Sequence, residues 1–492
     1  MQTALRPTPQ NTLLHIDGEW RDALSGKTSA TEDPSTGRVV VDVAQAGAED
    51  VDLAVTAARR AYDGGAWREI SEAERGRLLR RVADAILENR HELAELESVD
   101  SGKPINETLN IDVPLAAETF HYFAGWYSKV TGETIPLGPK YFHFTLREPV
   151  GVCALIVPWN FPLLLAARKL APALVAGNTV VLKPAPQTPL TALRLAAIFD
   201  EVGFPRGVVN VIPGTGSGAG EPLVSHPGID KISVTGSTET GQAVMRAAAQ
   251  NITKVSLELG GKSPNIVLDD ADLDEAVRGI QGGIFYNKGE VCTAGSRLFV
   301  QSSVHDVLVE RLTERARRMA IRQGDVLDQS TRLGPQVSER QLGNALRYVG
   351  IGQEEGASLV VGGKRAHPLG DDVGYFLEPT IFCGVTNEMR IAREEIFGPV
   401  LSVIRFDDLD DAIAQGNNSL YGLAAGVWTR DLQRAHQAAR RLQAGTVWVN
   451  CYNVFDAAAP YGGYKRSGLG RENGYAAIEQ YTQLKSVIMD LS

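Results

Sequence analysis

Short apolar runs rich in β-branched residues alternate with helical stretches from residue 151 onward, and this alternation restricts the chain to α/β folds. The first series runs from GVCALIVPWN at 151 to TETGQAVMRAAAQ, which ends at 250. The second begins with PNIVL at 264 and extends to AGTVWVNC, which ends at 451. Strands that alternate with helices of about ten to fifteen residues are typical of βαβ units and predict parallel sheets. We therefore predict two α/β domains.

The segments before this alternation are predicted to contain helices and one exposed strand. EDVDLAVTAARRAYDGG, residues 49–65, has helical apolar spacing and ends in glycines, and the run at 71–102 begins with a capping box of Ser71 and Glu74. KYFHFTLREPVG, residues 140–151, alternates like a strand that lies at a sheet edge or pairs with another chain. The first ten residues are rich in Pro, Thr and Gln, and we predict a mobile tail there.

Charge and cysteine usage exclude several classes of protein. The formal charge of -10 disfavours a nucleic-acid binder, because such proteins need a concentrated positive surface. Neither a signal peptide nor an uncharged run of bilayer-spanning length is evident, so we expect a cytoplasmic protein that does not engage a membrane. The four cysteines show no C-x-x-C spacing, and neither a disulfide framework nor a metal site is expected. The expected partners are small molecules and other copies of the chain.

Two glycine-containing turns are candidates for holding a phosphate. In NVIPGTGSGAG, the residues Gly214, Gly216 and Ala219 fit G-x-G-x-x-A, a loop that lets the backbone approach a pyrophosphate at a helix N-terminus. Glycine-rich turns after strands are common, which leaves an ordinary turn as the alternative. In SVTGSTETG, Gly236 and Ser237 close a strand before a helix, and the alternative there is a helix that is simply capped.

Lys183 and Glu258 are polar residues within β-like runs. Lys183 ends such a run, where it is suited to donate to a sugar hydroxyl or a phosphate, although a solvated lysine is the ordinary alternative. Glu258 lies between two leucines, so burial would raise its pKa toward the range of a general base. The alternative is an exposed position on a half-buried strand, since Ser256 and Glu258 alternate with apolar residues.

Cys292 lies within FYNKGEVCTAGSR, residues 285–297, and is the candidate nucleophile. A free cysteine is most often a small buried hydrophobe. Here the flanking residues, including Gly289, Thr293 and Gly295, leave the backbone accessible, and access favours a reactive thiol. No histidine is near in sequence, which weakens a Cys-His hydrolase without excluding it.

Six motifs, in this order and spacing, resemble the NAD(P)-dependent aldehyde dehydrogenase superfamily. The resemblance extends from IDGEW at 16 to QYTQLKSV near the C-terminus. The motifs are PWNFP at 158, TGSTETG, LELGGKSPNIV, NKGEVCTAGSR, EEIFGPV at 394 and PYGGYKRSGLGRENG from 460. Within the superfamily, the sequence looks like the broad-specificity branch that takes aliphatic and aromatic aldehydes.

The resemblance implies catalytic roles. Cys292 would attack the aldehyde carbonyl to give a thiohemiacetal, and Asn160 with the Cys292 backbone N–H would form the oxyanion hole. After hydride transfer, Glu258 would activate the water that hydrolyses the thioester to a carboxylic acid. Lys169 and Glu472 match family positions linked to proton relay.

The resemblance also implies NAD as the cofactor and a set of residues that line its site. These are Ile156, Pro158, Trp159, Lys183, Pro186, Gly216, Gly236, Ser237, Leu259, Glu395 and Phe397. Lys183 would contact the adenosine ribose, and Glu395 with Phe397 the nicotinamide ribose.

The implied architecture is a Rossmann-like cofactor domain, an α/β catalytic domain and a small β element that gives homodimers or homotetramers. The boundaries are 1–10 for the tail, 11–129 and 150–259 for the cofactor domain, 260–475 for the catalytic domain, and 130–149 with 476–492 for the oligomerisation element.

Two positions depart from common family patterns. Pro186 stands where NAD-preferring members commonly have a glutamate that repels a 2′-phosphate, so NADP is expected to be tolerated, with NAD still the first choice. Arg168 stands where many broad-specificity members have tryptophan, and there the chain resembles succinate-semialdehyde dehydrogenases, whose arginine suits a carboxylate. Alternatively, Arg168 points outward and is merely solvated.

The residues expected to line the substrate tunnel favour apolar aldehydes over aldehyde acids. They are Phe161, Leu165, Arg168, Tyr286, Val291, Thr293, Tyr452 and Phe455. Two other classes compete with a dehydrogenase. A Cys292-dependent ester or thioester hydrolase would turn over without nicotinamide, and a non-enzymatic relative would have lost catalytic residues, whereas Cys292, Glu258 and Asn160 are all present.

Overall fold

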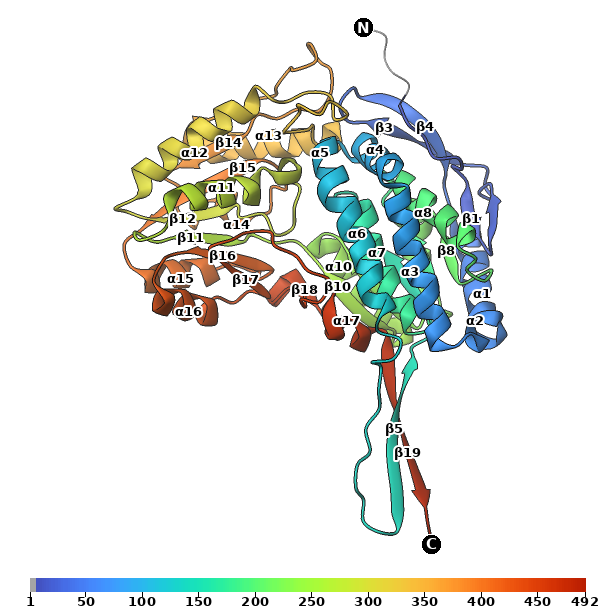
Figure 1. Cartoon of the computed structure of the whole chain (residues 1–492). Coiled ribbons are helices and arrows are strands. Elements are labelled where there is room, and N and C mark those ends of the chain that lie inside the picture. Colours follow the sequence, from blue (N-terminus) through green and yellow to red (C-terminus); the bar gives the residue numbers. More distant parts are fainter. Residues whose placement is uncertain (1–5) are drawn as a thin grey trace.

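The computed structural model describes residues 6–492, which form two α/β parts side by side and a long two-stranded arm that projects from them (Figure 1). The first part contains an eight-stranded sheet and the second a seven-stranded sheet. Most neighbouring strands in both sheets are parallel, which confirms the α/β fold predicted from the alternation of strands and helices.

The first sheet has the strand order β18-β10-β9-β6-β7-β8-β1-β2. Its five central strands are parallel, and the antiparallel pairs lie at the two edges. Every residue of β7 and β9 is buried, as expected for strands covered on both faces. The strands are β1 (Leu14–Ile16), β2 (Glu19–Arg21), β6 (Val152–Ile156), β7 (Thr179–Lys183), β8 (Val209–Val211), β9 (Lys231–Thr235), β10 (Lys254–Glu258) and β18 (Gly468–Leu469).

Helices cover both faces of this sheet and create two apolar cores. Along β6, Cys153 and Leu155 face the core built with α3, α6, α7 and α8, whereas Val152 and Ala154 face the core built with α1, α9 and α10. The helices are α1 (Ala48–Gly64), α2 (Ala66–Glu69), α3 (Glu72–Glu88), α4 (Arg90–Ser101), α5 (Ile105–Glu107), α6 (Val113–Ala124), α7 (Pro162–Val175), α8 (Leu190–Glu201), α9 (Glu221–Ser225) and α10 (Thr238–Asn251).

The single helix expected at 71–102 is two helices in the structure, because the helix is interrupted at Asn89. Ser71 caps α3 as predicted, and its hydroxyl accepts a hydrogen bond from the Glu74 amide at 3.2 Å. At the other end, the Asn89 side chain donates to the Ala85 carbonyl at 2.8 Å. An asparagine side chain that bonds the backbone offers an alternative to helical hydrogen bonding, which explains the end of α3.

The second sheet has the strand order β13-β14-β15-β12-β11-β16-β17, and only the β13–β14 edge pair is antiparallel. Its strands are β11 (Pro264–Val267), β12 (Arg297–Gln301), β13 (Ser358–Val361), β14 (Thr380–Cys383), β15 (Val400–Phe406), β16 (Ala424–Trp428) and β17 (Thr446–Val449). The helices of this part and of the C-terminal region are α11 (Leu273–Ile284), α12 (His305–Ala320), α13 (Glu339–Glu354), α14 (Arg390–Arg393), α15 (Leu409–Asn417), α16 (Leu432–Arg441) and α17 (Gly474–Gln480).

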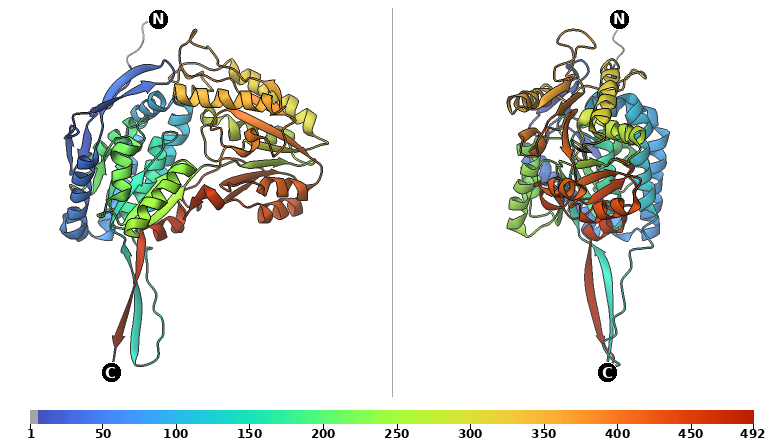
Figure 2. Two further views of the ribbon diagram at one scale, coloured as in Figure 1. Left: turned by 180° about the vertical axis from the view of Figure 1, so that it is seen from behind. Right: turned by 90° about the vertical axis from the view of Figure 1, so that its left-hand side faces the viewer.

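The arm consists of β5 (Tyr141–Pro149) and β19 (Thr482–Asp490), which pair antiparallel along their whole lengths. The strand expected at 140–151 is therefore present, and it pairs with the C-terminus of its own chain. Figure 2 shows that the arm stands clear of both sheets from two further directions. A second separate hairpin, β3 (Thr28–Asp33) with β4 (Arg38–Ala44), lies at the N-terminal side.

The chain crosses from the first sheet to the second between the end of β10 and the start of β11. β18, in the range 260–475 expected to be catalytic, pairs with β10, so this range also contributes a strand to the first sheet.

Residues 1–5 of the expected mobile tail lie outside the described residues. Arg6 forms ion pairs with Asp33 at 2.7 Å and Asp325 at 2.8 Å, so the described start of the chain is held in place. Within residues 6–492, no helix has the length and apolarity of a membrane span.

Candidate active site

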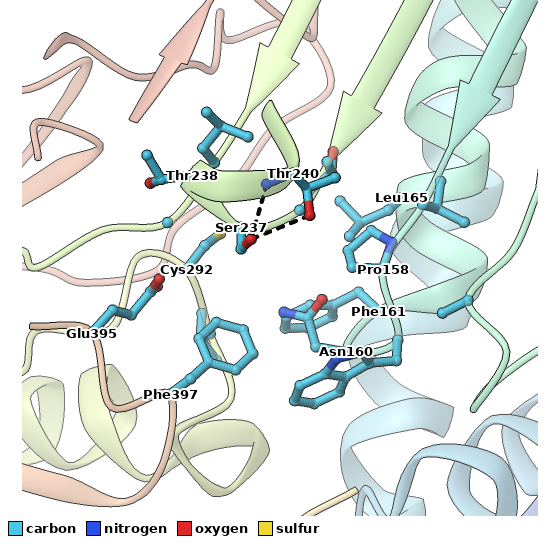
Figure 3. A pocket seen from close by; sticks show the side chains of 18 of the residues that line it. Pro158, Asn160, Phe161, Leu165, Ser237, Thr238, Thr240, Cys292, Glu395 and Phe397 are labelled. Carbon is cyan, nitrogen blue, oxygen red and sulfur yellow. Dashed lines mark hydrogen bonds between the residues drawn. The ribbon is translucent and has the colours of Figure 1, made fainter. Parts of the chain in front are cut away.

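A cleft with a cavity volume of about 1470 Å³ lies where the first sheet faces the second part of the chain. Ligand pockets for drug-sized molecules are commonly about 300–1,000 Å³, so this cleft has room for a dinucleotide and a substrate. One wall follows the carboxyl ends of β6, β7 and β9, where parallel sheets bind ligands. Figure 3 shows Cys292, Glu395 and Phe397 across the cavity from Pro158 and Leu165.

All the residues expected at the cofactor lie along this cleft. The set comprises Ile156, Pro158, Trp159, Lys183, Pro186, Gly216, Gly236, Ser237, Leu259, Glu395 and Phe397. They come from loops far apart in sequence, and the sheet gathers them because its parallel strands all end on the same side.

The turn at Gly236 and Ser237 begins α10 at the wall of the cleft (Figure 3). The Ser237 hydroxyl accepts a hydrogen bond from the Thr240 amide at 3.2 Å and caps the helix. The first-turn amides of a helix carry partial positive charge and bind phosphate groups well. The turn is thus both a helix cap and a wall of the cleft.

The other glycine loop differs from what its fingerprint predicts. Only Gly216 of the three fingerprint residues lines the cleft. A Cβ on Gly214 would lie 2.7 Å from the Ala219 side chain, so this glycine serves close packing within the loop. The formal G-x-G-x-x-A match therefore identifies one cleft residue.

Lys183 ends β7 and is 4% exposed. Its ammonium donates to the Pro184 carbonyl at 3.0 Å, and burial lowers the pKa of Lys183 to about 8. The alternative of a solvated lysine is excluded. A buried donor on the cleft wall gains from a ligand that accepts its hydrogen bonds.

Cys292 lies in the loop after α11, on the cleft wall opposite β6. Its Sγ lies 3.2 Å from the hydroxyl of Tyr461, and burial raises the pKa of the thiol to about 11. Gly289, expected to leave the backbone near the thiol accessible, has a different role. A Cβ on Gly289 would lie 2.2 Å from the backbone of Gly398, and its φ is 77°, so glycine is required there for packing rather than for access.

Asn160 is 3% exposed and is held by the loop that carries Cys292. Its amide nitrogen donates to the Glu290 carbonyl at 2.9 Å. The Asn287 side chain donates to the Asn160 carbonyl at 2.8 Å and to the Glu290 carbonyl at 3.2 Å. The amide of Asn160 is therefore fixed beside the cysteine loop.

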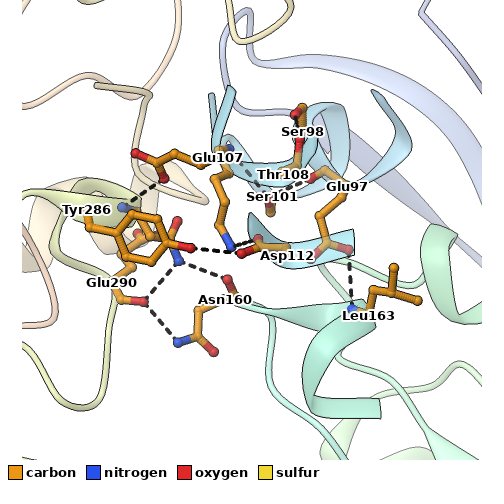
Figure 4. Close-up of polar contacts among 12 residues, drawn as sticks. Glu97, Ser98, Ser101, Glu107, Thr108, Asp112, Asn160, Leu163, Tyr286 and Glu290 are labelled. Atoms are coloured by element: carbon orange, nitrogen blue, oxygen red, sulfur yellow. Dashed lines mark hydrogen bonds and ion pairs between the residues drawn. The ribbon is translucent and has the colours of Figure 1, made fainter. Parts of the chain in front are cut away.

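A buried charged cluster lies beside Asn160 (Figure 4). Lys103 pairs with Asp112, which also accepts a hydrogen bond from the Tyr286 hydroxyl at 2.8 Å. Lys288 pairs with Glu290 at 3.1 Å. Both pairs are fully buried, and removal of one partner would leave an uncompensated charge. Sequence reasoning missed this cluster, because its members lie in separate segments without a local signal.

Glu258 ends β10, is 4% exposed and does not line the open cleft. Burial, with the charge of Glu472 nearby, raises the pKa of Glu258 well above its ordinary value. Glu472 pairs with Lys169, which also donates to the Ser233 hydroxyl at 3.1 Å. The structure thus brings together Glu258, Lys169 and Glu472 and excludes an exposed position for Glu258.

The expected tunnel residues also lie along the cleft: Phe161, Leu165, Arg168, Tyr286, Val291, Thr293, Tyr452 and Phe455. Arg168 is 6% exposed, and its guanidinium lies over the rings of Phe455 at 5.3 Å and Tyr461 at 5.2 Å. The alternative of an outward, solvated arginine is therefore wrong. Sequence reasoning did not single out Tyr461, although the motif PYGGYK contains it.

Among the described residues, no group of three or more His, Cys, Asp or Glu side chains is arranged to hold a metal ion. The lining of the cleft instead combines a thiol, a fixed amide, a helix N-terminus and a buried lysine. These features are typical of an enzyme site that binds a nucleotide-sized ligand beside a thiol.

Comparisons with known proteins identify the family. The model of the aldehyde dehydrogenase family matches residues 20–487, and the chain belongs to this family. It is 51% identical to the putative aldehyde dehydrogenase DhaS of Bacillus subtilis, over 100% of this chain and 97% of the relative. It is 49% identical to human mitochondrial aldehyde dehydrogenase, over 96% of this chain and 91% of the relative. The NAD⁺ complex of an aldehyde dehydrogenase from Bacillus cereus superposes with a TM-score of 0.96 at 48% identity, over 98% of this chain and 97% of that one.

Proposed function

We propose that the chain oxidises an aldehyde to a carboxylic acid with NAD, through covalent intermediates on Cys292. The observation that carries the proposal is that one and the same cleft is lined by Cys292, by Asn160 and by the helix N-terminus at Ser237. A nucleophile and a nucleotide site in one cavity suit a reaction between an enzyme-bound substrate and a cofactor.

The cleft residues fit NAD. The N-terminal amides of α10 suit a pyrophosphate, and Lys183 suits the hydroxyls of the adenosine ribose. Glu395 and Phe397 lie on the opposite wall and would contact the nicotinamide ribose. NAD, which is bound in the solved Bacillus cereus relative, supplies a hydride acceptor.

Cys292 and Asn160 would perform the first chemical step. The thiolate attacks the carbonyl carbon, and the carbonyl π electrons move to the oxygen. The second amide hydrogen of Asn160 and the backbone N–H of Cys292 would donate to this developing oxyanion. The bond from Asn160 to Glu290 uses only one amide hydrogen, which leaves the other for the substrate.

Glu258 would act in the last step, in which water hydrolyses the thioester. Its raised pKa makes the ionised carboxylate a stronger proton acceptor than an ordinary glutamate. Glu472 and Lys169 lie beside it and would pass that proton onward. From its buried position, the Glu258 side chain must turn toward Cys292 for this step.

We further propose that NADP is tolerated. Pro186 lies on the cleft wall where a ribose-binding carboxylate would repel a 2′-phosphate, and proline carries no charge. Comparison of kcat/KM with the two cofactors tests this idea. An efficiency with NADP below about one thousandth of that with NAD, equivalent to about 4 kcal/mol, would contradict it.

The proposed substrates are aliphatic or aromatic aldehydes, because seven of the eight expected tunnel residues are uncharged and four of them are aromatic. Arg168 supports the alternative of an aldehyde acid such as succinic semialdehyde, since its guanidinium is buried there and suits a carboxylate. Rates with hexanal, benzaldehyde and succinic semialdehyde distinguish the two. A strong preference for the acid that Arg168→Ala abolishes would reverse the ranking.

We also propose the domain boundaries given above and a homodimer or homotetramer assembled through the arm. The arm exposes apolar side chains, including Leu484 at 60% and Ile488 at 59%, and such patches mark interaction sites. Light scattering of the purified protein tests this assembly. The cytoplasmic location stays a prediction.

The decisive test of the activity is an aldehyde panel followed by the absorbance of reduced nicotinamide, with Cys292→Ala as the control. Oxidation that requires NAD and is lost in the variant is expected. A Cys292-dependent hydrolase would turn over esters without nicotinamide and leave aldehydes unchanged. Full oxidation by the Cys292→Ala variant would overturn the assignment of the nucleophile.

A further inference from the structure

Tyr461 occupies a position at the reacting thiol that the proposed mechanism does not use. Its hydroxyl lies 3.2 Å from Cys292 Sγ and is the one side-chain hydrogen-bond partner of this thiol among residues 6–492. Tyr461 is 5% exposed. Its backbone exchanges two hydrogen bonds of 2.7 Å with Glu472, so the ring is held from a rigid base.

Arg168 lies on the face of the same ring. Its guanidinium carbon is 5.2 Å from the ring centre, and the Phe455 ring meets the Tyr461 ring edge-on at 5.9 Å. No ion pair of Arg168 with a carboxylate is found among the described residues. A cation over an aromatic face attracts the π electrons, which makes the phenol hydroxyl a stronger donor.

The protonation of the Tyr461 phenol and of the Cys292 thiol suits a hydrogen bond from the phenol to the sulfur. Burial raises the pKa of Tyr461 well above its ordinary value, so the phenol keeps its proton at neutral pH. Burial also raises the pKa of Cys292, and the hydrogen bond from Tyr461 and the charge of Arg168 oppose that rise. A donor to the ionised form favours ionisation.

We propose that Tyr461 is a catalytic residue, whose hydroxyl donates a hydrogen bond to the Cys292 thiolate and is strengthened as a donor by Arg168 on its ring. The inference rests on the proposed role of Cys292 as the nucleophile. The thiol proton leaves to a base or to water, and Tyr461 keeps its own proton. As the bond from sulfur to the carbonyl carbon forms, the negative charge passes to the carbonyl oxygen and the hydrogen bond to sulfur weakens.

This role has a specific kinetic signature. A hydrogen bond to a charged group stabilises that charge, so loss of the donor raises the pKa of the thiol by about one to two units. A more basic thiolate is also more nucleophilic, and this greater nucleophilicity offsets about threefold to tenfold of the loss in rate. The net result is a fall of about threefold to tenfold in thiol reactivity below the thiol pKa.

The experiment measures alkylation of Cys292 by iodoacetamide at pH 7 to 9, without aldehyde or NAD, by mass spectrometry of the peptide that contains Cys292. Tyr461→Phe keeps the ring and removes the hydroxyl. Tyr375→Phe removes a distant hydroxyl that bonds Glu32 at 2.8 Å and serves as the matched control. We expect slower alkylation in Tyr461→Phe by about threefold to tenfold and no change in the control.

Arg168→Met separates the effect of the Tyr461 hydrogen bond from the effect of Arg168 on that bond. It should slow alkylation in the wild-type background and have a smaller effect in the Tyr461→Phe background, because the arginine acts partly through the phenol. An alkylation rate in Tyr461→Phe equal to or above that of the wild type would overturn the inference. Oxidation that survives Cys292→Ala would instead overturn the proposed function, so the two failures are distinguishable.

Discussion

The side-chain amide of Asn160 donates a hydrogen bond to the backbone carbonyl of Glu290, at 2.9 Å and across 130 positions of sequence. Glu290 is two residues before Cys292, so this bond ties the loop after β6 to the loop of the thiol. An amide held in this way needs no reorganisation when charge develops on a substrate oxygen.

Replacement of Asn160 tests this pre-organised donor. We expect Asn160→Ala to lower kcat/KM by about 100-fold to 1,000-fold, because one oxyanion donor contributes about that factor. The affinity for NAD, measured by titration of tryptophan fluorescence, should stay unchanged. Asn251→Ala, which removes a surface amide bonded to Ser225, is the matched control. A loss of NAD affinity equal to the loss of rate would point to a collapsed cleft instead.

Asn287 is expected to matter through the hydrogen bonds of its side chain rather than through its backbone conformation. Its φ is 44°, so alanine there adds strain, whereas glycine does not. Both Asn287→Ala and Asn287→Gly should lower kcat, by about tenfold, because each removes the side-chain donor to the Asn160 backbone carbonyl, at a cost of about 1–3 kcal/mol. Each also removes one of the two side-chain donors to the Glu290 carbonyl, which keeps the bond from Asn160. Steady-state kinetics with a saturating aldehyde measure the change. Normal activity in Asn287→Gly would show that only the backbone conformation counts.

Glu258→Gln should separate formation of the thioester from its hydrolysis. Loss of a general base costs about 100-fold to 10,000-fold in the step that it serves. Rapid-mixing experiments should therefore retain a burst of reduced nicotinamide and then a much slower steady rate. Glu472→Gln, which leaves Glu258 in place, should keep more of the steady rate. Absence of the burst in Glu258→Gln would assign the base to an earlier step.

Lys262 predicts a pH dependence of stability. It is 1% exposed, and burial with the nearby charge of Arg297 lowers its pKa to about 7 from 10.5. Between pH 7 and 10 the unfolded chain binds more protons at this site than the folded chain. The free energy of unfolding therefore gains about 2–4 kcal/mol from this residue as the pH rises through that window, and loses it again as the pH falls to 7.

Lys262→Met removes this contribution. Urea unfolding at pH 6.5 should find the variant more stable than the wild type. At pH 9.5 the difference in the free energy of unfolding between the two should be smaller by about 2–4 kcal/mol. Lys364→Met, on a lysine that is 74% exposed, provides the control. A difference between Lys262→Met and wild type that is the same at both pH values would refute the prediction.

Local sequence narrows the alternatives at parts of this site without deciding between them. The pattern around Glu258 allows either a buried carboxyl with a raised pKa or an exposed position on a half-buried strand, and the structure supports the buried carboxyl. Other local signals mislead. Gly289 looks like a source of access to the thiol but serves close packing on Gly398, and the helical pattern at 71–102 gives no sign of the break at Asn89. At Gly289 the backbone of the distant Gly398 decides the outcome, whereas at Asn89 a local hydrogen bond from the side chain to the Ala85 carbonyl does.

By itself, the sequence determined the α/β class and the family, because alternating strands and helices leave a local periodicity and six motifs stand in register. Only the tertiary structure decided the surroundings of Cys292. Its partner Tyr461 is 169 positions away, and the charged cluster beside Asn160 joins residues from three separate segments. Hydrogen bonds and buried ion pairs between such distant residues depend on how the two sheets pack, and no local pattern encodes that packing.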